Sequence, residues 1–120
     1  MMRSSGQSPA RKAVNFLVGA VVFLTTANTA IGSEPEQPRQ RELIHLLVQD
    51  CGSCHGLTLK GGLGPALLPQ NLATKDDEYL AEVILQGVPG TPMPPWEFEI
   101  SKDEANWLVK RLKEGGINDR

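Results

Sequence analysis

Apolar residues recur at helical spacing in three segments of the chain, so the hydrophobic pattern predicts three helices. The first covers residues 41–49 and leads into Cys51 without an interrupting proline or glycine. The second begins near residues 74–77, with Thr74 as N-cap and acidic residues in the first turn, and ends at Gly87. The third begins at a capping box, Ser101–Glu104. The apolar positions are Leu43, Ile44, Leu47 and Val48 in the first helix, Leu80, Val83 and Ile84 in the second, and Ala105, Leu108, Val109 and Leu112 in the third.

The segments between these helices are rich in glycine and proline. Residues 56–69 contain four glycines and two prolines, and residues 87–95 contain four prolines and two glycines. Such stretches favour loops and stiff extended backbone over helix or strand. No run of β-branched residues alternates with polar ones as a strand would require. The predicted fold class is therefore all-α, with three main helices joined by long ordered loops.

The N-terminal segment has the order of a secretory signal peptide. Three basic residues precede an apolar run, residues 14–24, and small residues follow it. This order predicts export and cleavage between Gly32 and Ser33, with Ala27 and Ala30 as alternative cleavage positions. An uncleaved membrane anchor is the competing interpretation, but the apolar run is shorter than the roughly 20 residues that span a bilayer.

Cleavage would divide the remainder into a flexible leader, a domain and a short tail. Residues 33–40 are rich in proline, glutamate and glutamine and predict the leader. The domain would cover residues 41–116 and the tail residues 117–120. The chain after residue 32 contains nine basic and fourteen acidic residues, a formal net charge of −5. Nucleic acid is a poor partner for that charge, and no stable membrane insertion is expected after cleavage.

One motif carries redox chemistry. Cys51, Cys54 and His55 have the spacing of covalent haem attachment, in which two thiols add to the haem vinyl groups and the imidazole ligates iron. A disulfide would close a very small loop and stabilise little. A thioredoxin-like pair expects a strand before the motif, and zinc needs four ligands, whereas the chain has two cysteines and two histidines. We predict one haem c, bound through Cys51 and Cys54.

The sixth position of the iron has three candidates: Met93, His45 or no protein ligand. Met93 is the only methionine after residue 32, and prolines on both sides limit the freedom of its loop. A methionine that only fills a gap in the core is the alternative. His45 precedes Cys51 on the same predicted helix, which favours an exposed position on the wrong side of the haem. We predict His55 and Met93 as the metal ligands.

The order helix, Cys-x-x-Cys-His, Gly-Pro loop, helix, proline-flanked methionine and C-terminal helix resembles the class I cytochrome c family. The resemblance covers residues 41–114 and implies that the first and last helices cross, with Leu43 and Leu47 near Trp107 and Leu108. The family's Gly-Pro-x-Leu motif is matched by residues 64–67. By that resemblance, the Pro65 carbonyl should accept the His55 Nδ1 proton and so orient the imidazole.

Longer runs resemble the small periplasmic cytochromes c55X, which are associated with cytochrome cd1 nitrite reductase in denitrification. The resemblance implies a periplasmic, monomeric electron carrier, not an enzyme, that donates electrons to that reductase. Its alternatives are an assembly factor for d1 haem, and a sensor or haem enzyme with an open sixth site. We expect an apolar docking face near residues 61–63 and the Met93 loop, with Trp96 either in that face or buried against the haem. The matching runs are residues 41–43, 50–56, 59–67 and 89–96.

Overall fold

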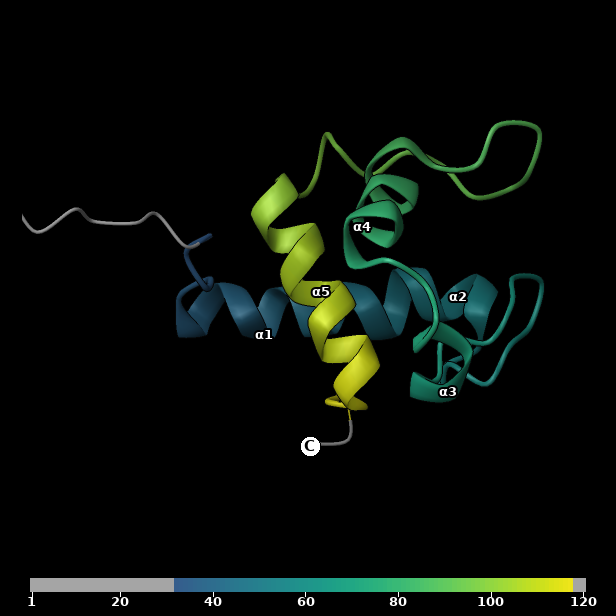
Figure 1. The fold of residues 1–120 in the computed structure, drawn as a ribbon, viewed down its shortest axis with the longest axis horizontal. Helices are drawn as coiled ribbons and strands as arrows, with labels where there is room; N and C mark the ends of the chain where they lie inside the picture. Colours follow the sequence, from purple (N-terminus) through teal and green to yellow (C-terminus); the bar gives the residue numbers. More distant parts are fainter. Residues whose placement is uncertain (1–31, 118–120) are drawn as a thin grey trace, which may run out of the picture.

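The computed structural model describes residues 32–117, and these residues form helices and loops with no strand, which confirms the all-α prediction. The predicted signal peptide and C-terminal tail lie outside the described residues, apart from Gly32 and Ile117. Within the described part, no helix is long and apolar enough to cross a membrane. The elements are α1 (Gln37–Leu46), the π-helical turn η1 (Leu47–Cys51), α2 (Gly52–His55), α3 (Pro69–Leu72), α4 (Asp77–Gln86) and α5 (Lys102–Glu114) (Figure 1).

The first helix begins at Gln37, four residues earlier than predicted, so the second half of the predicted flexible leader is helical. The apolar pattern missed this turn because residues 37–42 are polar, although a proline in the first turn is a known start signal. Glu34 also contacts the domain, since its carboxylate accepts a hydrogen bond from Trp107 Nε1 at 3.3 Å. The helix then passes through η1 into α2, where the Gly52 amide donates to the Leu47 carbonyl five residues back.

The second predicted helix, α4, begins at Asp77, the last position of the expected range, but with a different N-cap. Its N-cap is Asp76, whose carboxylate accepts a hydrogen bond from the Tyr79 amide at 2.9 Å, and Thr74 lies outside the helix. Aspartate and threonine both suit an N-cap, so the type of residue alone did not settle the start. The predicted end at Gly87 is confirmed, with a φ of 68° there. The short helix α3 was not predicted, because a single turn carries no periodic pattern.

The third predicted helix, α5, is confirmed with its capping box. The Ser101 hydroxyl accepts from the Glu104 amide at 3.3 Å, and the Glu104 carboxylate accepts from the Ser101 amide at 2.7 Å. The helix ends at Gly115, whose φ of 74° is left-handed. Leu108 and Val109 on its inner face are almost completely buried, so α5 is the central element of the core.

Helices α1 and α5 cross, as Figure 1 shows, and the resemblance is confirmed on this point. Leu43 and Leu47 belong to the same buried cluster as Trp107 and Leu108. At the edge of the crossing, Arg39 Nε donates to Glu104 at 2.6 Å, and this contact raises the pKa of the arginine and lowers that of the glutamate. The crossing packs α1 on α5, the attachment motif follows α1 on η1 and α2, and α3 and α4 also pack on α5.

Candidate cofactor site

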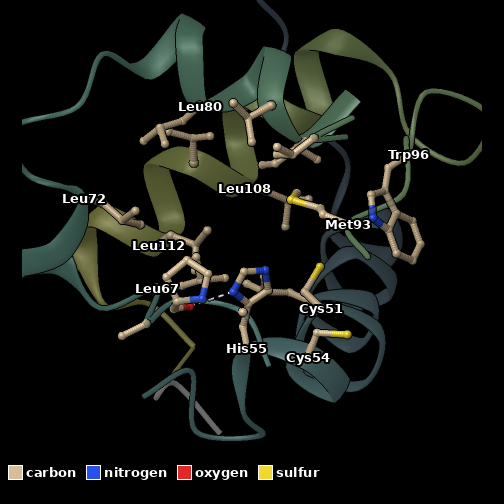
Figure 2. Close-up of a pocket in the computed structure, with 18 of the residues that line it drawn as sticks. Cys51, Cys54, His55, Leu67, Leu72, Leu80, Met93, Trp96, Leu108 and Leu112 are labelled. Atoms are coloured by element: carbon tan, nitrogen blue, oxygen red, sulfur yellow. Dashed lines mark hydrogen bonds between the residues drawn. The ribbon is translucent and has the colours of Figure 1, made fainter. Parts of the chain in front are cut away.

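A pocket of about 780 Å³ opens between the attachment motif, α4, α5 and the loop that carries Met93. Most of its wall is apolar, with leucine, valine and isoleucine side chains from α1, α4 and α5. Figure 2 shows Leu80, Leu108 and Leu112 around it. A largely apolar hollow of this size in an 86-residue folded region is suited to a large apolar ligand, which would cover side chains that otherwise face water.

Cys51, Cys54 and His55 all line this pocket from one continuous stretch of helical backbone. Cys51 is the last residue of η1, and the other two lie on α2, so both thiols and the imidazole reach the same space. The two thiols are not bonded to each other. Burial, and to a smaller extent the Asp50 carboxylate, raises the pKa of the Cys51 thiol to about 11. Disulfide exchange requires a thiolate, so this thiol is poorly suited to that reaction.

The His55 ring is buried, with 9% of its surface exposed, and its orientation is set by one hydrogen bond. Nδ1 donates to the Pro65 carbonyl at 2.7 Å, which confirms the contact that the resemblance implies (Figure 2). Because a carbonyl can only accept, Nδ1 carries the proton and Nε2 of the neutral ring keeps its lone pair. Figure 2 shows that second nitrogen pointing into the pocket, where it can bind a metal.

Glycines allow the loop after His55 to lie against the motif. A Cβ built on Gly64 would lie 2.7 Å from two atoms of the His55 ring, and one on Gly62 would lie 2.7 Å from the Cys54 carbonyl oxygen. The loop is held there by two backbone bonds of 2.8 Å, from Gly61 to the His55 carbonyl and from Gly64 to the Cys54 carbonyl. These glycines are required for close approach rather than for flexibility.

Gly64→Ala is therefore expected to push the imidazole out of position and destabilise the holoprotein by about 1–3 kcal/mol, the usual cost of overpacking. Thermal unfolding and the visible spectrum would measure the effect. Gly52→Ala is the matched control, because its Cβ would lie 3.4 Å from the nearest atom and Gly52 has a helical φ of −62°. Equal stability of the two variants would contradict the role of Gly64.

Met93 lines the pocket from the loop that follows α4, and Figure 2 shows its sulfur on the side that the free His55 nitrogen faces. The loop is held from both directions: the Met93 carbonyl accepts from the Val88 amide at 3.2 Å, and the Met93 amide donates to the Thr91 hydroxyl at 3.3 Å. A Cβ on Gly87 would lie 2.7 Å from the Met93 carbonyl oxygen, so the loop packs directly on the end of α4.

Of the remaining candidate residues, Trp96 lines the pocket and His45 does not. His45 is exposed on α1 and is not part of the pocket wall, as predicted. Trp96 is half-buried, lines the pocket and stacks on Phe98 with 6.2 Å between ring centroids, which favours the buried alternative over the docking face. The sequence did not single out Asn71, Lys75 or Tyr79, which also line the pocket, because polar residues beside a short helix carry no distinctive pattern.

These residues fit a covalently bound haem. The pocket supplies two neighbouring thiols, a fixed imidazole with a free nitrogen, and an apolar space large enough for a porphyrin. The attachment residues lie at one side of that space, so the macrocycle would extend from them between the apolar walls. The His55 imidazole and the Met93 thioether are also suitable ligands, since both kinds of group bind haem iron in proteins.

Comparison with known proteins gives three findings. The family model for cytochrome c oxidase, cbb3-type, subunit III matches residues 38–110. Cytochrome c55X of Pseudomonas aeruginosa is 51% identical over 110 residues, which cover 89% of this chain and 92% of the relative. The solved structure of the c-type cytochrome NirC is 59% identical, with a TM-score of 0.68, and the match covers 69% of this chain and 98% of that one.

A larger protein shares the same module. Dihydro-haem d1 dehydrogenase of Pseudomonas aeruginosa is 39% identical over 64 residues, which cover 53% of this chain and 13% of the relative. The similarity is thus confined to a small part of that protein.

Proposed function

The chain belongs to the cytochrome c55X family of c-type cytochromes, and from that premise we propose that it is a periplasmic one-electron carrier to cytochrome cd1 nitrite reductase. It carries one haem c, and Cys51 and Cys54 fit its attachment. When bound, the haem supplies the ferric–ferrous couple of its iron. Removal of residues 1–32 on export is part of the proposal, and so is a folded domain that ends near residue 116.

We propose that His55 and Met93 are the two axial ligands. The supporting observation is that both side chains line one pocket and face each other across it. Two protein ligands leave no open position for nitrite, oxygen or peroxide, which favours electron transfer over catalysis. The thioether favours ferrous iron, and the apolar wall excludes water and disfavours the extra charge of the ferric state.

The proposed docking surface consists of Leu57 and Leu63, which are exposed beside the attachment motif. Their exposed fractions are 61% and 76%, and Leu63 also lines the pocket. Large apolar side chains in water are suited to a partner surface, and small contacts of this kind give the short-lived complexes that electron transfer requires.

Anaerobic stopped-flow mixing tests electron delivery. Reduced protein is expected to be oxidised by oxidised cytochrome cd1 nitrite reductase at a rate that rises with reductase concentration. Leu63→Asp should lower the second-order rate constant several-fold. Gln70→Asp is the control for the added charge, since Gln70 is exposed and does not line the pocket. If the reductase does not oxidise the protein, the proposed partner is wrong. If both variants lower the rate constant equally, the proposed docking surface is wrong.

A second candidate function is a role in making or inserting d1 haem. The supporting observation is the similarity to a segment of dihydro-haem d1 dehydrogenase. As an assembly factor, the protein would bind d1 haem itself. Titration of the holoprotein with d1 haem, followed by absorbance, distinguishes the two: tight binding supports assembly, and no binding together with rapid oxidation by the reductase supports delivery.

A further inference from the structure

Three polar side chains interrupt the apolar wall of the pocket, and all three are exposed: Asn71, Lys75 and Tyr79. They lie four residues apart, on α3, the α3–α4 link and α4. Figure 2 shows Leu72 and Leu80, the chain neighbours of Asn71 and Tyr79, on the opposite side of the pocket from the two cysteines. In the part of the chain that the structure describes, none of the three polar side chains makes a hydrogen bond or ion pair.

Lys75 is the only lysine or arginine among the described residues of the pocket wall. It is followed by three acidic residues, but each of these has another partner. Asp76 caps α4, and Asp77 and Glu78 each form an ion pair with a lysine of α5. The ammonium group of Lys75 therefore keeps an uncompensated positive charge at the rim of an apolar pocket.

The backbone at Lys75 is held firmly against α5. Lys113 Nζ donates to the Lys75 carbonyl at 2.5 Å and also contacts the Asp77 carboxylate. Lys113 therefore joins α5 to the α3–α4 link and to the start of α4. The backbone of Lys75 is therefore fixed before any ligand binds. This reduces the conformational entropy that is lost on binding.

Haem chemistry identifies what these side chains would meet. The two vinyl groups of haem lie on adjacent pyrroles and the two propionates on the other pair, at the far side of the ring. Attachment through Cys51 and Cys54 would therefore direct the propionates toward the opposite wall. Asp50, the acidic residue of the wall, lies at the cysteine side, where it does not oppose them.

We infer that Asn71, Lys75 and Tyr79 form the propionate-binding rim of the pocket. The Lys75 ammonium pairs with a propionate carboxylate, and the Tyr79 hydroxyl and Asn71 amide donate hydrogen bonds to the propionates. Such charge-assisted contacts orient the ring plane and offset negative charge near the iron. The inference concerns how the haem is held and is independent of which protein receives the electron.

Potentiometric titration of the holoprotein tests the charge. Lys75→Gln is expected to lower the reduction potential, because an uncompensated propionate favours ferric iron. The expected change is about threefold or more in the redox equilibrium constant, on a scale where tenfold is about 59 mV for one electron. Lys110→Gln is the control, since Lys110 is exposed on α5 outside the pocket. Equal potentials for the two variants would overturn the role of Lys75.

Proton NMR of the ferrous holoprotein tests the geometry directly. Nuclear Overhauser contacts are expected between the propionate methylene protons and the Tyr79 ring, and Tyr79→Phe should keep the contacts while shifting the propionate resonances. Contacts of the propionates with side chains elsewhere, and none with Lys75 or Tyr79, would overturn the assignment even if the potentials shift.

Discussion

Met93→Leu is expected to lower the reduction potential on the order of 0.2 V and to open the sixth coordination position, while the covalent haem stays attached. Leucine matches methionine in volume and apolar character, so it preserves the packing of the Gly87–Trp96 loop but removes the sulfur. Potentiometry, loss of the far-red charge-transfer band of the ferric form, and binding of added cyanide or carbon monoxide would measure the change.

The choice of leucine separates two roles of the methionine. If Met93 only fills a gap, Met93→Leu should retain the wild-type potential and spectrum while Met93→Ala loses stability. If Met93 ligates the iron, both variants should lose the ligand, and Met93→His should restore a six-coordinate spectrum at a lower potential. A wild-type spectrum for Met93→Leu would therefore refute axial ligation and return the open-site sensor or enzyme to consideration.

The double variant Cys51→Ala/Cys54→Ala is expected to release its haem on extraction with acidified organic solvent and then to lose its helical structure. Without haem, the pocket of about 780 Å³ has no filling. The leucine, valine and isoleucine side chains that line the pocket would then lose their packing partner and be exposed to water, at a cost of about 1.5–3 kcal/mol for each side chain that becomes fully exposed. The whole stability of a small domain is about 5–15 kcal/mol, so the apoprotein should not remain folded.

Extraction followed by far-ultraviolet circular dichroism measures this effect. Ser53→Ala is the matched control, because Ser53 lies between the two cysteines and is exposed, and its hydroxyl donates to the Asp50 carbonyl at 2.6 Å and more distantly to Cys54 Sγ at 3.8 Å. That variant should keep its haem through extraction and its helices. Haem that survives extraction in the double variant would contradict attachment through these two thiols, and a helical apoprotein would contradict the haem as the main part of the core.

Sequence signals between neighbouring residues predicted one end of a helix correctly where those residue types have a single structural role. The capping box at Ser101 and Glu104 predicted the start of α5 correctly, because reciprocal bonds between the two residues need only neighbouring chain. The start of α4 lies at Asp77, within the predicted range of residues 74–77, but the N-cap is Asp76 and not Thr74, because threonine and aspartate both suit that position. The start of α1 was missed because its first turn is polar and is held by contacts with α5.

The sequence by itself determined the all-α class, the attachment motif and the candidate ligand, because each depends on residue type, short spacing or helical period. It also predicted, through family resemblance, the bond from His55 to Pro65. Only the tertiary structure decided which side chains share the pocket. Met93 and His55 are 38 residues apart in the chain, and Lys75 joins the wall of the same pocket through the packing of α3 and α4 on α5. Contacts between residues so far apart in the chain depend on how separate helices and loops pack. The periodicity of apolar residues along one helix contains no information about that packing.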